Sequence, residues 1–107
     1  RVSQINGCGT CLSIHVPAAR KAGVPENKLD ALPAWRMVDE FTEKEKAALE
    51  LAETLTLLPK DRDNSRAALP ACQVFAEEQV AALEWSIIMI NAFNRVSIAS
   101  GHPLLSR

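Results

Sequence analysis

The sequence has almost no net charge, few aromatic residues and no long apolar run. Of its 107 residues, 12 are Lys or Arg and 13 are Asp or Glu, which leaves a formal net charge of −1 at pH 7. This balance provides no electrostatic attraction to nucleic acid or to an anionic membrane surface. No stretch approaches the ~20 apolar residues of a membrane span, and none has the pattern of a signal peptide. We therefore expect neither nucleic acid nor a membrane as a partner.

Cysteine and glycine are also scarce. Three cysteines are an odd number, which argues against the paired disulfides of a small secreted domain and favours a cytoplasmic protein. Only four glycines occur, whereas Ala, Leu and Glu are frequent, as in helical proteins. The length suits one domain. We predict a single all-α domain over residues 1–107, and we expect N-terminal residues of the full protein to precede it.

Local signals divide the chain into about five or six helices. Thr42 and Glu45 form a capping-box pattern at the start of one of them. In that helix Leu51 belongs to a predicted core stripe, whereas Glu50 and Glu53 are predicted to lie mostly on the solvent side. A polar loop is expected over residues 59–65. The predicted helical segments are 1–6, 8–22, 25–32, 42–58, 66–74 and 77–99, with a further short helical piece or turn over 33–38.

The last predicted helix, over residues 77–99, is apolar on nearly every side in its middle. Such a helix is either the central one of a bundle or part of an oligomer interface. In a chain this short the pattern makes a lone monomer improbable, so we expect a homo-oligomer.

Cys8 and Cys11 lie three positions apart, and His15 follows four positions after the second cysteine. In a helix these steps place all three side chains on one face. Gly7 favours a helix start at Cys8, where unpaired backbone N–H groups and the helix dipole stabilise an anion. The thiolate is the form of cysteine that attacks peroxides and disulfides. The pattern therefore indicates a reactive dithiol with an acid–base group one turn further along.

A zinc site is the main alternative for these residues. Zinc takes four ligands, and only Cys72 or His102, both distant and unpaired, remain to complete a set with Cys8, Cys11 and His15. A thioredoxin-type dithiol would follow a strand in a βαβ unit, and the sequence lacks that pattern. We therefore predict a helical redox dithiol that uses no cofactor.

The remaining distinctive side chains are expected to have structural roles. Cys72 is predicted to be a small buried residue, and Trp35 is predicted to be a core or interface anchor. Asn91, Asn94 and Arg95 lie at steps of three and four on the last helix. We expect them to make hydrogen bonds to another helix or subunit.

The segment from Ser3 to His15, with its Cys-x-x-Cys-x-x-x-His core, resembles the central motif of the AhpD-like alkylhydroperoxidases, within the carboxymuconolactone decarboxylase superfamily. Further similarity covers residues 19–23, 34–36, 41–45, 47–49 and 90–95, so only the region 59–74 matches poorly. The cysteine–histidine core is the diagnostic part. The resemblance implies an AhpD-like helical bundle, homo-oligomers and reduction of hydroperoxides by a cysteine pair.

Carried over by position, the resemblance assigns the peroxidatic thiolate to Cys11, the resolving role to Cys8 and proton transfer to His15. The helix N-terminus alone would instead favour Cys8 as the more acidic thiol. The family's electron donors include lipoyl-type and other external dithiols. Thr10 stands where related chains often have histidine, and the upstream relay glutamate of the family is not part of this sequence. A redox-sensing or binding module with the same fold and little turnover is the second hypothesis.

Overall fold

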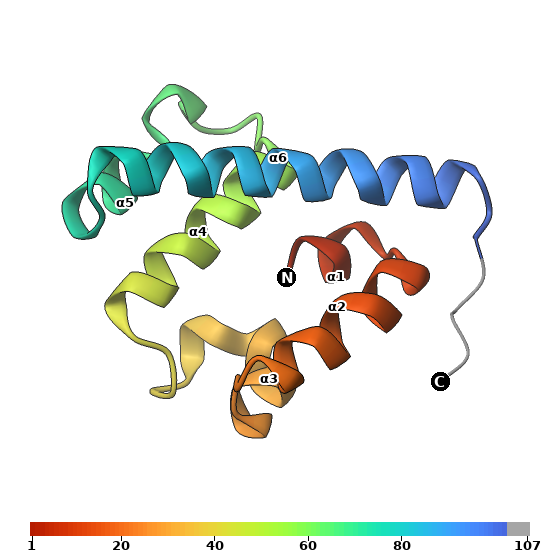
Figure 1. The fold of residues 1–107 in the computed structure, drawn as a ribbon. Coiled ribbons are helices and arrows are strands. Elements are labelled where there is room, and N and C mark those ends of the chain that lie inside the picture. Colours follow the sequence, from red (N-terminus) through yellow and green to blue (C-terminus); the bar gives the residue numbers. More distant parts are fainter. Residues whose placement is uncertain (103–107) are drawn as a thin grey trace.

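The structure is a computed structural model that describes residues 1–102, and within them every regular element is a helix (Figure 1). The predicted all-α fold is therefore confirmed. The α-helices are α1 (Val2–Asn6), α2 (Gly9–Lys21), α3 (Glu26–Ala31), α4 (Glu43–Leu57), α5 (Leu69–Val74) and α6 (Glu77–Ala99), and the 3-10 helices are η1 (Leu32–Met37) and η2 (Asn64–Arg66).

The long helix α6 organises the bundle. With 23 residues it is about 35 Å long, close to the 40 Å extent of the molecule. Figure 1 shows α4 crossing α6, with the short helix α1 between α6 and α2. Helix α1 packs against α6, α4 and α2, so the segment that leads into the cysteine motif lies inside the bundle.

The hydrophobic core is built where α1, α4, α5 and α6 meet. Its buried side chains include Leu51 and Ala52 of α4 and Ile87 of α6, with exposed fractions of 1%, 7% and 4%. Burying a leucine or isoleucine side chain contributes roughly 1.5–3 kcal/mol. Val2 of α1 joins the same cluster. The five-residue helix α1 is thus held by the shared core, since an isolated helix of this length is unstable.

The predicted capping box begins α4. The backbone N–H of Glu45 donates to Thr42 Oγ1 at 3.1 Å, and the backbone N–H of Thr42 donates to Glu45 Oε1 at 2.9 Å. The same Glu45 oxygen accepts from Lys28 Nζ at 2.7 Å, which ties α3 to the start of α4. A local signal therefore also makes a tertiary contact.

The predicted solvent-facing position of Glu53 is wrong. Only 9% of this residue is exposed, because η1 and the N-terminal residue lie over its side of α4. Its Oε1 atom accepts from Trp35 Nε1 at 2.8 Å and from Arg1 Nε at 3.0 Å. Its Oε2 atom accepts from Arg36 Nη1 at 2.5 Å. Burial alone would raise the pKa of Glu53, but the hydrogen bonds from Arg36, Trp35 and Arg1 outweigh it and lower the pKa.

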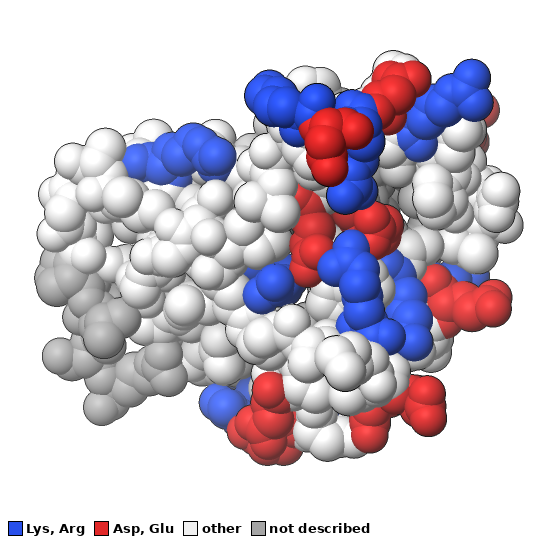
Figure 2. Space-filling view, turned by 180° about the vertical axis from the view of Figure 1, so that it is seen from behind, with Lys and Arg blue, Asp and Glu red and all other residues white. Residues whose placement is uncertain are grey.

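Charged side chains are unevenly distributed over the surface. Figure 2 views the molecule from behind. It shows positive and negative side chains gathered on one half of that face, whereas the half towards the end of α6 carries few of them. Among the helices of residues 1–102, none is long and apolar enough to cross a membrane.

Candidate redox site

Cys8 lies at the junction of two helices. Helix α1 ends at Gly7, whose φ of 69° is the left-handed conformation that glycine adopts without strain. The backbone N–H of Cys8 donates to the Ser3 carbonyl at 3.1 Å, and that of Gly7 donates to the Gln4 carbonyl at 3.3 Å. Cys8 itself is extended and is the N-cap of α2. The last turn of α1 and the first turn of α2 therefore fix one cysteine together.

Cys8 and Cys11 form a disulfide, with their Cα atoms 5.3 Å apart. Both residues are buried, with exposed fractions of 2% and 6%. The backbone N–H of Cys11 donates to Cys8 Sγ at 3.2 Å. The sulfur of Cys8 thus takes the place of the side-chain oxygen that usually caps a helix. The first turn of α2 contains no acidic residue that would oppose an anion there.

His15 lies one turn after Cys11 on α2, and it is exposed. Helix geometry separates the Cβ atoms of such a pair by about 5–6 Å. Within residues 1–102, no hydrogen bond or ion pair restrains the imidazole. The structure therefore exposes His15 to solvent and buries the two cysteines of the motif in the protein.

The C-terminal end of the bundle contacts the motif between the two cysteines. Thr10 Oγ1 donates to the backbone carbonyl of His102 at 2.8 Å, just after the end of α6. Ser13 Oγ donates to the Thr10 carbonyl at 2.7 Å. Residues from opposite ends of the described chain thus meet at the cysteine pair.

Three asparagines form a partly buried cluster between α1 and α6, which we call the amide cluster (Asn6, Asn91 and Asn94). Asn6 Nδ2 donates to Asn91 Oδ1 at 2.9 Å and to Asn94 Oδ1 at 3.0 Å. Asn91 Nδ2 donates to Thr56 Oγ1 and Asn94 Nδ2 donates to Ser3 Oγ, at 3.0 and 3.1 Å. The predicted structural role of Asn91 and Asn94 is confirmed.

Arg95 was predicted to reach another helix or subunit; within the chain it bonds inside α6 to Asn91 Oδ1 at 2.7 Å. The role of Asn6 in this cluster was not predicted, because a single asparagine before a glycine resembles an ordinary helix stop.

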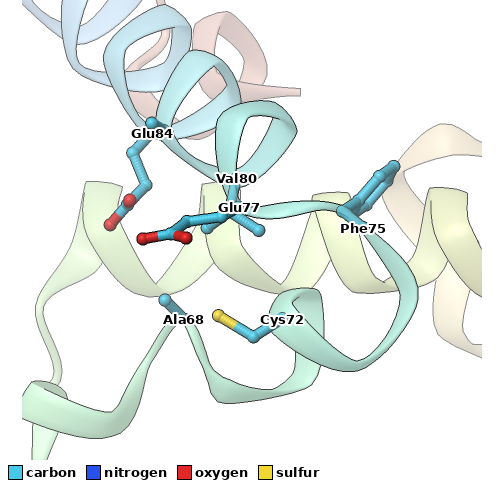
Figure 3. A pocket seen from close by; sticks show the side chains of 7 residues that line it. Ala68, Cys72, Phe75, Glu77, Val80 and Glu84 are labelled. Atoms are coloured by element: carbon cyan, nitrogen blue, oxygen red, sulfur yellow. The ribbon is translucent and has the colours of Figure 1, made fainter.

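Cys72 is exposed, so the prediction of a buried residue is wrong. It lines a surface pocket of about 500 Å³ between α5 and the first turns of α6. Figure 3 shows its sulfur on the α5 side of this pocket, across from the carboxylates of Glu77 and Glu84 on α6. The cysteine motif contacts the C-terminal end of α6, whereas Cys72 lies beside the N-terminal turns of that helix. From Val80 to Asn94 the helix rises about 20 Å. Within one chain Cys72 therefore does not belong to the cysteine pair.

The zinc alternative finds no geometric support. Within the part of the chain that the structure describes, no three His, Cys, Asp or Glu side chains converge as metal ligands would. The sulfurs of Cys8 and Cys11 are bonded to each other.

A helical bundle with a cysteine pair at the start of a helix defines a class of dithiol–disulfide proteins that is separate from the thioredoxin fold. The chain belongs to the carboxymuconolactone decarboxylase family, whose pattern matches residues 1–54. It is 41% identical to the uncharacterized protein YdfG of Bacillus subtilis (strain 168) over 107 residues, which are all of this chain and 73% of YdfG.

A solved structure has the same fold. It is a protein of unknown function from Agrobacterium tumefaciens, provisionally described as the antioxidant defence protein AhpD. The superposition has a TM-score of 0.87 at 26% sequence identity, and it covers 99% of this chain and 73% of that protein. The predicted AhpD-like bundle is confirmed.

Proposed function

We propose that this protein reduces hydroperoxides through a dithiol–disulfide cycle of Cys8 and Cys11, with His15 in proton transfer. The observation that carries the proposal is the Cys8–Cys11 disulfide at the N-terminus of α2, with His15 one turn beyond it. Membership of the family and the likeness to the Agrobacterium protein support the same chemistry. The protein is then an alkylhydroperoxidase-like oxidoreductase.

The oxidising half of the cycle begins with the reduced pair. The Cys11 thiolate attacks the outer oxygen of the hydroperoxide, and the O–O bond breaks as the S–O bond forms. The alkoxide leaves with the electron pair and takes a proton from His15, which gives the alcohol. Cys11 is now a sulfenic acid. The Cys8 thiolate attacks its sulfur and expels hydroxide, which is protonated to water as the disulfide forms.

The reducing half of the cycle needs an external dithiol, such as a lipoyl-type compound. One of its thiolates attacks a sulfur of the pair, and its second thiol then displaces the mixed disulfide. Both cysteines return to thiols, and the donor leaves as its own disulfide. In sum, a hydroperoxide and a dithiol give an alcohol, water and a disulfide.

Peroxide consumption with a dithiol reductant tests the proposal in a Cys72→Ser background. We expect sustained consumption of tert-butyl hydroperoxide with dihydrolipoamide, and a loss of at least about 100-fold in Cys8→Ser or Cys11→Ser, because nucleophile and resolving thiol act as a unit. His15→Ala should slow the reaction by about 100-fold. Sustained turnover in both cysteine variants would contradict the proposal.

The same assay separates the enzyme from the redox sensor. A sensor would form one disulfide per chain and then stop, even with the reductant present. Intact mass after a single addition of peroxide would show a loss of two hydrogens in either case, so the number of turnovers decides between them. Mass spectra of the two single-cysteine variants, with the sulfenic acid trapped, would show which sulfur is oxidised first.

We also propose that copies of this chain associate through the outer face of α6. Apolar side chains on this helix are widely exposed, which is unusual for a monomer. Those more than half exposed are Trp85, Met89, Phe93 and Val96. Light scattering after size exclusion should give a mass above that of one chain, and Phe93→Glu with Val96→Glu should reduce it. The cytoplasmic location stays a prediction.

A further inference from the structure

Asn94 uses both ends of its side-chain amide on the helix that precedes the cysteine pair. The residue is fully buried, with an exposed fraction of 0%. Its Oδ1 atom accepts from Asn6 at 3.0 Å, and its Nδ2 atom donates to Ser3 Oγ at 3.1 Å. Ser3 and Asn6 are three positions apart, so one buried side chain holds the last turn of α1 at two points.

Ser3 connects this clamp to Cys8. Its carbonyl accepts the backbone N–H of Cys8 at 3.1 Å, while its hydroxyl accepts from Asn94. Cys8 Sγ in turn accepts the backbone N–H of Cys11. Two hydrogen bonds to Ser3, one at its hydroxyl and one at its carbonyl, therefore link Asn94 to the backbone of Cys8, which carries the sulfur. Asn6 and Asn94 are 88 positions apart, so the hydrogen bond between them depends on the tertiary fold.

We propose that Asn94 is a positioning residue for Cys8: by holding Ser3 and Asn6 it keeps the Cys8 sulfur at the N-cap of α2. This inference rests on the proposed function, in which a Cys8 thiolate closes the disulfide. Reduction breaks only the S–S bond and leaves the α1 clamp and the α2 cap in place. The Cys11 N–H and the dipole of α2 then stabilise the thiolate that resolves the sulfenic acid.

The clamp is needed because α1 cannot position Cys8 by itself. A helix of five residues is too short to be stable alone, and the Gly7 turn that follows adds flexibility. The side chain of Asn94 bonds to α1 through neutral groups, whereas the guanidinium of Arg95 contacts the amide cluster at Asn91, in an exposed position. A neutral clamp therefore positions the sulfur while leaving the electrostatic stabilisation of the anion to α2.

The experiment follows one thiol at a time. In a Cys11→Ser, Cys72→Ser background only Cys8 titrates, and its thiolate is followed by absorbance at 240 nm and by alkylation with iodoacetamide at pH 7. Relative to this background, Ser3→Ala and Asn94→Ala should raise the pKa of Cys8 by about one, which lowers the alkylation rate at pH 7 by up to about tenfold.

Thr56→Val is the matched control. It removes a partly buried hydrogen bond of the same cluster, from Asn91 to the buried Thr56, but it lies outside the connection from Asn94 to Cys8. We expect it to lower the unfolding midpoint about as much as Ser3→Ala while changing the alkylation rate by less than twofold. A merely structural role of Asn94 would give all three variants the same unchanged titration.

An unchanged Cys8 titration in folded Ser3→Ala would overturn the inference, and so would an equal shift in Thr56→Val. If Asn94→Ala does not fold, Ser3→Ala decides alone, because it removes a single hydroxyl group. These measurements need no peroxide. A failure of the clamp is thereby separated from a failure of the peroxidase proposal, which the turnover assay tests.

Discussion

Helix α1 is held at its two ends by clusters of opposite character. At its start, Arg1 donates to the buried carboxylate of Glu53, which Trp35 and Arg36 also bind; we call these four residues the carboxylate cluster. At its end, Asn94 of the amide cluster binds Ser3 and Asn6. The first cluster is ionic and depends on pH, whereas the second bonds to α1 through neutral groups. The second one adjoins the cysteine.

The difference suggests a division of tasks. A buried carboxylate with several donors contributes to stability as long as it is ionised, and it is costly to disrupt. Amides give less stabilisation, but they keep the same hydrogen bonds across the pH range. The region close to Cys8 thus has a geometry that does not depend on the ionisation of its neighbours, and the charged cluster stabilises the opposite end of the same helix.

The largest effect is expected from Glu53→Gln. Glutamine has no negative charge, so the partly buried cations of Arg36 and Arg1 lose their counter-charge. Its side chain offers them either an amide N–H₂ group, which cannot accept, or an amide oxygen, which is a weaker acceptor. We expect a loss of about 3 kcal/mol in the free energy of unfolding, measured by urea denaturation. Glu50→Gln, whose partner Arg36 lies half exposed, is the matched control and should cost less than about 1 kcal/mol.

Acid should weaken the carboxylate cluster next. The pKa of Glu53 is lower in the folded protein than in the unfolded chain, where glutamate has a pKa of about 4.3. The stabilisation by Glu53 is therefore complete above that value and is lost as the pH falls through the lower folded pKa. Unfolding midpoints between pH 6 and pH 3 should drop more steeply in the native chain than in Glu53→Gln. Parallel curves would show that the carboxylate cluster does not set the acid stability.

Trp35→Phe should have a smaller effect. The phenyl ring keeps most of the buried apolar surface, but it has no N–H group for Glu53, whose Oε1 atom still accepts from Arg1. The lost hydrogen bond and the smaller ring should together cost about 1.5 kcal/mol. Thermal unfolding followed by circular dichroism measures this loss. A cost as large as that of Glu53→Gln would mean that packing, and not the carboxylate, dominates this end of α1.

The smallest effect is expected from Thr10→Val at the neutral end. It removes the hydrogen bond to the His102 carbonyl but keeps the branched shape. We expect a loss of about 0.5–1 kcal/mol with no change between pH 6 and pH 4, because both partners are neutral. A pH-dependent loss would contradict the idea that the geometry of the region close to Cys8 does not depend on the ionisation of its neighbours.

Local patterns in the sequence predicted much of the fold. The capping box of Thr42 and Glu45 marked the start of α4, and the Gly7 break predicted a helix start at Cys8, which is the N-cap of α2. Both depend on residues three or fewer positions apart, so the signal is complete within a short window. The spacing of Cys8, Cys11 and His15 likewise follows from the period of one helix.

Side chains whose partners are distant in sequence were harder to predict. Glu53 looked like one of several charged residues on α4, and its burial depends on Trp35 and Arg1, which are 18 and 52 positions away. Cys72 was expected inside because small apolar residues usually are, but α5 joins the core through Ala71 and leaves Cys72 exposed. Neither outcome is encoded in local periodicity.

The sequence by itself determined that this chain is helical and that a cysteine pair begins one of its helices, because helix periods and caps are short-range properties. Only the tertiary structure decided how that pair is held. The residues that clamp α1 and Arg1 come from α4 and α6, and hydrogen bonds between such distant positions exist only after the bundle has packed.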